Sequence, residues 1–284
     1  MNKYIKTLLL STALLCFGAG SVSAAQFSDA KGQELTATQL AQKLAKYDVV
    51  FFGEYHDQSE IHKSEIDLLE ALHKIKGEKL ALSMEMFEVD NQEKLDSFLA
   101  GQLNEADFLA TSRPWPNYKA DYAPLVNFAK EQKMPVVAAN VPRFLAAHVA
   151  KNNASTAGIE EQYQKWLPKK TYAPEGAYKD KFYAQMNSPE APMKMPPARL
   201  AAVYAAQCLK DDKMAESIVA FSDEHQNMQV LHINGCFHSD GHLGTAQKLE
   251  ALRPELKVAV ITPLERRQKG VSPAGDFVVW FDRK

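Results

Sequence analysis

Two tetrapeptides of the form Gly-x-x-His follow apolar runs in the sequence, one from Gly53 to His56 and the other from Gly235 to His238. The first also carries Glu54, and side chains two residues apart in an extended segment point the same way, so Glu54 and His56 share a side. An imidazole beside a carboxylate suits general acid/base chemistry. The same pair is also a ligand set for zinc, manganese or iron.

A third acidic residue, Glu85, interrupts the apolar run from 80 to 87 near its C-terminal end. A carboxylate buried there is costly unless a cation or hydrogen-bond donors compensate it. We therefore predict that Glu54, His56, Glu85 and His238 form one site, either as catalytic groups or as ligands of a divalent metal ion.

Arg143 follows a third apolar run, in Asn140-Val141-Pro142-Arg143. A guanidinium at that position would reach the same edge of a sheet and could hold a carboxylate or a propionate in a bidentate manner. A role as a surface or helix-start residue is an equally open interpretation.

The other histidines lie outside the two Gly-x-x-His tetrapeptides. His242, four residues after His238, would add a ligand if the segment between them were helical, although Gly241 intervenes. Four more lie in helical or loop segments and are expected at the surface: His62, His73, His148 and His225.

Tyrosines supply a different kind of candidate. Tyr118, Tyr122 and Tyr178 lie in loop-like segments or in a region that we predict to be inserted. A tyrosine phenolate can be an axial ligand of ferric haem. Ordinary packing is the alternative role for each of them.

The elements that must position these residues alternate along the chain. Apolar runs predict strands at 49–52, 80–87, 135–140, 230–233, 258–261 and 277–281, and helical spacing predicts helices at 61–75, 92–109, 122–133 and 245–252. Alternation of this kind is typical of an α/β fold, a mostly parallel sheet flanked by helices. In such sheets the carboxyl ends of the strands form the binding edge. The Pro- and aromatic-rich stretch 115–122 is predicted to be a loop over the site.

The chain divides into three parts by pattern. Residues 1–24 read as a signal peptide, with a basic start, a short apolar centre and small residues before the cleavage point. Residues 25–154 and 226–284 form the α/β core domain, and 155–225 form a helical insertion. We expect a periplasmic or otherwise exported protein. Lipid anchoring at Cys16 is not favoured, because Leu15 precedes it where a small residue is needed.

Charge and cysteines set the limits on partners. The chain has 33 basic and 35 acidic residues, which gives no electrostatic case for binding nucleic acid or an anionic membrane surface. Small molecules or proteins are the expected partners. Cys208 and Cys236 remain after removal of the signal peptide, and the sequence leaves open whether they pair.

Six segments of the chain form a recognisable combination. They are Phe52-Gly53-Glu54-Tyr55-His56-Asp57, Met84-Glu85-Met86-Phe87, the loop with Trp115, Tyr118 and Tyr122, Asn140-Val141-Pro142-Arg143, 207–215, and Gly235-Cys236-Phe237-His238. Together they resemble one known family, the ChaN-like haem-binding uptake proteins, whose wider superfamily includes the Tiki and TraB proteins and is similar to erythromycin esterases. The resemblance runs from about Tyr47 to Glu265.

The resemblance implies two functions for the same residues. One is a haem carrier of bacterial iron acquisition, which holds haem through an axial tyrosine or histidine, with Arg143 or a lysine on the propionates. An outer-membrane haem uptake system and a homodimer are the partners to expect. The other is a metal-dependent hydrolase, as in Tiki-type relatives, with the shared site mapped onto Glu54, His56, Glu85, Arg143 and His238. We favour the haem carrier.

Overall fold

An eight-stranded sheet organises the residues that the computed structural model describes, 26–189 and 194–283. The predicted signal peptide lies outside the described residues. The strands are β1 (Phe27–Asp29), β2 (Glu34–Leu35), β3 (Val49–Glu54), β4 (Leu80–Glu88), β5 (Val136–Asn140), β6 (Gln229–Gly235), β7 (Val258–Glu265) and β8 (Phe277–Phe281). Their order in the sheet is β2-β1-β8-β7-β3-β6-β4-β5.

The sheet is mostly parallel. Strands β3 to β8 pair in parallel, whereas β1 pairs antiparallel with both β2 and β8. After β3 the chain builds β4 and β5 on one side, and after β6 it builds β7 and β8 on the other. The direction in which strands are added therefore reverses between β3 and β6. At this topological switch point the connecting loops diverge and leave a crevice at the carboxyl ends of the strands.

Helices cover both faces of the sheet. The α-helices are α1 (Ala37–Leu44), α2 (Ser59–Lys76), α3 (Gln92–Leu99), α4 (Glu105–Thr111), α5 (Ala123–Glu131), α6 (Arg143–Lys151), α7 (Glu161–Gln164), α8 (Ala177–Met186), α9 (Pro197–Glu224) and α10 (Gly244–Leu252). The α/β fold predicted from the alternating pattern is confirmed. Among the described residues, no helix is both long and apolar enough to span a membrane.

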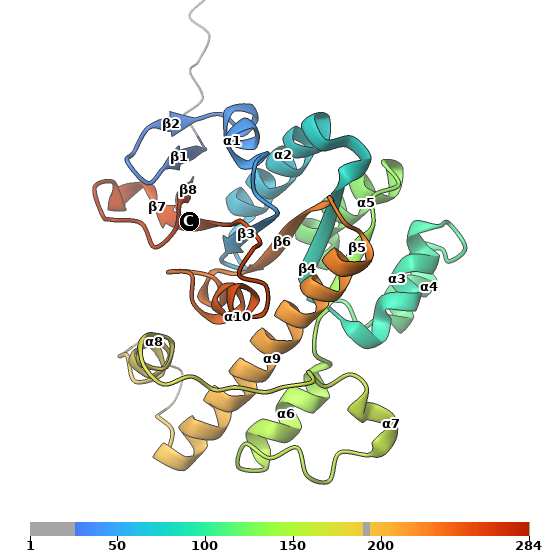
Figure 1. Ribbon diagram of the computed structural model, residues 1–284, viewed down its shortest axis with the longest axis vertical. Helices are drawn as coiled ribbons and strands as arrows, with labels where there is room; N and C mark the ends of the chain where they lie inside the picture. The colour runs from blue at the N-terminus through green and yellow to red at the C-terminus, as the bar shows by residue number, and fades with distance from the viewer. Residues whose placement is uncertain (1–25, 190–193, 284) are drawn as a thin grey trace, which may run out of the picture.

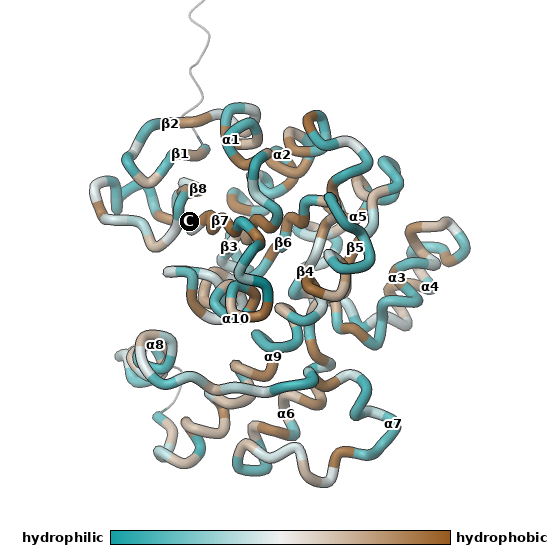
Figure 2. Tube along the Cα trace, in the orientation of Figure 1, coloured by the Kyte–Doolittle hydropathy of each residue, from teal (hydrophilic) through white to brown (hydrophobic). Residues whose placement is uncertain are grey.

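The apolar strand β3 is buried on both sides because its side chains alternate between two cores. Val50 and Phe52 belong to the larger core, which includes buried residues of α1, α2, α3 and α5. Val49 and Phe51 face the smaller core, formed with α9 and α10. Figure 2 shows hydrophobic residues concentrated along the central strands of the sheet.

The region 155–225 contains α7, α8 and α9 and, among its described residues, no strand. Helix α9 is 28 residues long and runs from beside the outer helices α6 and α8 up to the sheet, as Figure 1 shows. Tyr178 and Phe182 of α8 pack with Leu200 and Tyr204 of α9 in a separate apolar cluster. Because α8 packs against this long helix, α8 lies beside the crevice.

Two predicted elements differ in detail. The helix expected at 92–109 is two helices, α3 and α4, because the chain turns at Gly101 with a positive φ of 73°. The stretch 115–122 ends in a π-helical turn, Tyr118–Tyr122, which leads directly into α5. Strands β1 and β2 and helix α1 were not predicted from the sequence, although Thr36 and Gln39 form a capping box at the start of α1.

Candidate functional site

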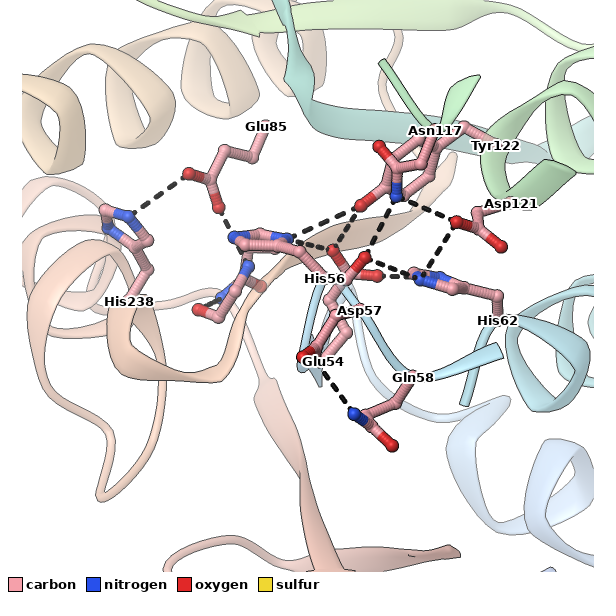
Figure 3. A network of polar contacts seen from close by, with 12 residues as sticks. Glu54, His56, Asp57, Gln58, His62, Glu85, Asn117, Asp121, Tyr122 and His238 are labelled. Atoms are coloured by element: carbon pink, nitrogen blue, oxygen red, sulfur yellow. Dashed lines mark hydrogen bonds and ion pairs between the residues drawn. The ribbon is translucent and has the colours of Figure 1, made fainter. Parts of the chain in front are cut away.

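A cavity of about 930 Å³ opens at the carboxyl ends of β3, β4 and β6. Glu54, His56, Glu85, Arg143 and His238 all line it, so the structure brings together the residues that the sequence singled out at strand ends. Figure 3 shows four of them, Glu54, His56, Glu85 and His238, in one network of polar contacts.

The two Gly-x-x-His turns fit into one another. A Cβ atom added at Gly53 would lie 3.0 Å from Cα of Cys236, in the second turn. A Cβ atom added at Gly235 would lie 2.8 Å from Nε2 of His56, in the first turn. Each turn therefore needs its glycine to leave room for the other. This close approach is the physical reason for the repeated motif.

Glu54 and His56 form the first half of the network. Nδ1 of His56 is hydrogen-bonded to Oε1 of Glu54, which also accepts a hydrogen bond of 2.8 Å from the Tyr122 hydroxyl. Burial alone would raise the pKa of Glu54, but hydrogen bonds from His56 and His62 lower it to about 2. Burial opposes a charge on His56 as well, yet its bond to Glu54 and the nearby Glu85 raise its pKa. The contact with Glu54 therefore favours a proton on His56.

Glu85 lies where β4 leaves its neighbours. The pairing of β4 with β6 ends at Met84, and its register with β5 shifts between Met84 and Glu88. Oε2 of Glu85 accepts a hydrogen bond of 2.8 Å from the backbone N–H of Gly235, and Asn140 Nδ2 donates to the Glu85 carbonyl at 3.1 Å. Side chains thus replace the ladder bonds that are lost when the strands separate.

His238 lies between two carboxylates. Its Nδ1 is 2.6 Å from Oδ1 of Asp211 on α9, and its Nε2 is 3.3 Å from Oε1 of Glu85. Burial would lower the pKa of His238, but the negative charges of Glu85 and Asp211 raise it to about 10. In turn, burial would raise the pKa of Glu85, and the positive charges of His238 and His56 hold it well below its usual range. His238 and Glu85 are therefore both charged at neutral pH.

A second polar cluster lies behind the cavity. His62 of α2 was expected at the surface, but it is only 4 % exposed and its Nδ1 is 2.9 Å from Glu54 and 3.2 Å from Glu65. Burial opposes a charge on His62, but the two carboxylates raise its pKa to about 11. Burial and the charge of Glu54 raise the pKa of Glu65 well above its usual value. The prediction for His62 was wrong because its helical position faces inward.

Basic, acidic and aromatic side chains line the rest of the cavity. Arg143 lines the cavity, with Nε bonded to Glu88 and Nη2 donating to the Arg113 carbonyl at 3.0 Å. Lys181 also lines it and lies 4.6 Å from the ring centroid of Phe237. Burial lowers the pKa of Lys181. Further lining residues are Trp115, Val141, Phe182, Met186 and Lys210.

The three candidate haem tyrosines are buried, and none is among the described residues that line the cavity. The Tyr122 hydroxyl donates to Glu54, and the Tyr178 hydroxyl donates to Asp211 at 2.6 Å. Tyr118 packs edge to face with Phe87 and Phe108. Burial raises the pKa of all three phenols, with the carboxylate partners of Tyr122 and Tyr178 adding to the effect. Phenolate formation is therefore unfavourable at each.

The four predicted metal ligands do not lie in one close group of donor atoms among the described residues. In that part of the chain, the one group of three or more ligand residues whose donor atoms all lie within 4.8 Å is Glu54, His62 and Glu65. His56, Glu85 and His238 are outside it. His242 is held away from the site by Glu250, at 2.8 Å, and Asp276, at 3.0 Å. Cys208 and Cys236 are both buried free thiols.

Sequence reasoning missed His62, Glu65 and Asp211. A signal for the first two was present, because His62, Glu65, Leu69 and Leu72 recur at spacings of three and four residues and so share one stripe of a helix. Polar residues on an apolar stripe point to a buried polar cluster. Asp211 gave the same kind of signal, because Cys208, Asp211, Ala215 and Ile218 recur at spacings of three and four residues.

Comparison with known proteins follows from this fold and site. A model of the family described as haem-binding uptake, Tiki superfamily, ChaN matches residues 40–249. ChaN of Campylobacter jejuni, a structure that describes cofacial heme binding, is 19% identical, with a TM-score of 0.67 over 89% of this chain and 94% of that one. A mutant of the erythromycin esterase EreC in its open conformation is 12% identical, with a TM-score of 0.50 over 88% of this chain and 81% of that one. No curated protein matches the chain.

The fold is α/β, and the family match places the chain in the Tiki superfamily. The family match covers most of the chain, from 40 to 249. The chain belongs to the ChaN family of haem-binding uptake proteins. The two similar structures support the fold alone, since both are distant in sequence.

Proposed function

We propose that this protein is exported and binds haem in the cavity at the carboxyl ends of β3, β4 and β6, as part of bacterial iron or haem uptake. The observation that carries the proposal is the cavity itself, in a chain of the haem-binding family. Its volume of about 930 Å³ lies in the range of about 300–1,000 Å³ that cofactor sites occupy.

The residues present fit a flat apolar molecule with acidic substituents. Trp115, Phe182 and Phe237 offer aromatic surface, and Arg143, Lys181 and Lys210 place positive charge where propionates would reach. Haem bound there would supply an iron that accepts an axial ligand from the protein.

His56 is the best placed axial ligand. Its side chain is 39 % exposed, and its Nδ1 is bonded to Glu54, which fixes the ring and directs Nε2 away from that carboxylate. Trp115 packs against its ring with centroids 4.7 Å apart. This assignment replaces the three tyrosines as the first candidate, because their hydroxyls are turned into the protein.

The direct test is titration of the purified chain 25–284 with ferric haem, followed by Soret absorbance. We expect saturable binding by the parent and a loss of affinity of more than about tenfold in His56→Ala, comparable to the effect of removing a close partner of a metal ligand. His225→Ala, at an exposed position, is the matched control.

Two results would count against the proposal. A parent chain without saturable binding would refute haem binding at this site. Equal affinity in His56→Ala and His225→Ala would refute His56 as the ligand, and the same titration of Tyr122→Phe and Tyr178→Phe would then test the tyrosines.

Export rests on the N-terminal sequence pattern and is tested separately. We expect the full chain, expressed in a Gram-negative host, to appear in the periplasmic fraction. Its mass should be that of a chain whose first residue is Ala25. A full-length chain retained in the cytoplasm would refute export. A homodimer and an outer-membrane uptake partner belong to the same proposal, and sedimentation with and without haem tests the dimer.

A further inference from the structure

The buried cluster behind the cavity wall has the composition of a metal site. Glu54 ends β3, while His62 and Glu65 lie one turn apart on α2. Their exposed fractions are 1 %, 4 % and 0 %. Nδ1 of His62 is 2.9 Å from Oε2 of Glu54 and 3.2 Å from Oε2 of Glu65. Figure 3 shows His62 pointing from its helix toward Glu54.

Two carboxylate oxygens in this cluster are fully buried and poorly satisfied. Oε2 of Glu54 has only the ion-pair contact of 2.9 Å with Nδ1 of His62, and Oε1 of Glu65 has no hydrogen bond. Two carboxylates meet the imidazole of His62, so a protonated His62 balances one of them, and Glu65 holds its own proton because burial and the charge of Glu54 raise its pKa. Buried charge of this kind is costly unless a proton or a cation neutralises it. A divalent cation with two carboxylates and a neutral imidazole gives zero net charge.

The donor atoms are also spaced for direct coordination. A tetrahedral Zn²⁺ ion with bonds of about 2.1 Å separates its ligand atoms by about 3.4 Å. The two separations of 2.9 and 3.2 Å that the structure gives are slightly shorter, as expected for groups drawn together without an ion between them. Imidazole nitrogen with carboxylate oxygen is a donor set that Zn²⁺ and Mn²⁺ accept.

The surrounding contacts orient the ligands. Nε2 of His62 lies 3.3 Å from the carbonyl oxygen of His56, a bond that leaves Nδ1 as the free coordinating nitrogen. Oε1 of Glu54 is already held by His56 and by the Tyr122 hydroxyl. Only Oε2 of Glu54 then faces the cluster. Partners of this kind usually accompany a ligating histidine and carboxylate.

We propose that Glu54, His62 and Glu65 bind one divalent transition-metal ion of the Zn²⁺ or Mn²⁺ type. The site shares only Glu54 with the ligand set predicted from the sequence, and it lies behind the cavity wall instead of in it. Glu54 links the two, because its other oxygen holds His56. The ion thus positions His56 through Glu54 and needs no contact with a cavity ligand.

The test is metal content after refolding, because ligands that are fully buried load most readily as the chain folds. The chain 25–284 is unfolded with chelator, refolded with Zn²⁺ or with Mn²⁺, desalted and assayed for bound metal. We expect one equivalent of one of these ions in the parent. Glu65→Gln keeps the volume but removes a charged ligand, and it should lose most of the metal, as should His62→Gln.

Two controls locate the site. Glu70→Gln lies on the same helix outside the cluster and should keep one equivalent. His238→Ala removes an imidazole from the cavity set and should also keep one equivalent. Loss of metal in His238→Ala with retention in Glu65→Gln would overturn the proposal and place the ion in the cavity.

Failure of the variants to fold does not remove the test, because the parent can be loaded with Co²⁺ and examined by X-ray absorption. One imidazole and carboxylate oxygens in the first coordination sphere support the proposal. A refolded parent that retains neither Zn²⁺ nor Mn²⁺ overturns it and leaves the cluster as an ion pair around a protonated His62. None of these measurements uses haem, so they stand whatever the titration of the cavity shows.

Discussion

Replacing Glu85 with glutamine tests the charge balance of the cavity. The side chain keeps its volume, and its carbonyl oxygen can still accept the hydrogen bond from the Gly235 N–H that the carboxylate accepts at 2.8 Å. What disappears is the negative charge 3.3 Å from Nε2 of His238. His238 retains its contact with Asp211 at 2.6 Å.

The size of the effect follows from two opposing quantities. Opposite unit charges 3.3 Å apart attract by about 5 kcal/mol at an effective dielectric constant of about 20. The cost of burying both charges offsets much of this attraction. A net loss of about 1.5–3 kcal/mol in the free energy of unfolding remains for Glu85→Gln, the usual value for a hydrogen bond to a charged group.

The effect must also depend on pH with a definite sign. The pKa of His238 is raised to about 10, so its stabilisation is complete below about pH 6.5, its unfolded value, and is lost as pH rises through about 10. The pKa of Glu85 is depressed, so its part is present above its unfolded value of about 4.3 and is lost only in acid. The penalty of Glu85→Gln is therefore greatest near pH 6 and shrinks toward pH 10.

Urea unfolding of the parent, Glu85→Gln and the exposed control Glu131→Gln at pH 6, 8 and 10 measures this penalty. The midpoint should fall in Glu85→Gln at constant m-value, and the control should stay within roughly 0.5 kcal/mol of the parent. A penalty that is constant across this pH range, or absent at pH 6, would refute the assigned ion pair.

Three other perturbations test the contacts around His56. Gly235→Ala places a methyl group 2.8 Å from Nε2 of His56 and should cost about 1–3 kcal/mol in urea unfolding; an unchanged midpoint would contradict the interlocked turns. Tyr122→Phe removes the hydrogen bond to Glu54 and should cost about 1.5–3 kcal/mol while Soret absorbance of the haem complex persists; loss of that absorbance would return Tyr122 to the ligand set. Haem affinity should rise from pH 6 to pH 8, because the raised pKa of His56 keeps a proton on the ligating nitrogen at lower pH. A haem affinity that does not change with pH would argue against His56 as the ligand.

The sequence predicted the sheet well where strands are buried on both faces. The run from Val49 to Phe52 is wholly apolar, and only a central strand of a parallel sheet hides such a segment from water. The short strands β1 and β2 escaped notice because their three and two residues are too few to show a period.

The convergence of Glu54, His56, Glu85 and His238 was predictable because parallel strands end at one edge. The contacts of these residues were not, since they depend on helices far away in the chain. Asp211, which holds His238, comes from the middle of α9, and α9 is placed by packing against α6, α8 and the sheet. The tyrosine candidates lie outside the cavity for the same reason, because packing decides which way a loop residue turns.

The separation of β4 from β6 after Met84 makes one backbone amide of the site, that of Gly235, observable by NMR as a reporter of the cavity. The amide proton of Gly235 is bonded to the Glu85 carboxylate and not to a carbonyl of the neighbouring strand. An N–H that donates to a charged oxygen resonates at lower field than one in a neutral ladder and exchanges slowly while the bond persists. A single resonance of a ¹⁵N-labelled sample therefore reports whether the cavity carboxylate is charged, protonated or displaced, without any label attached to the site.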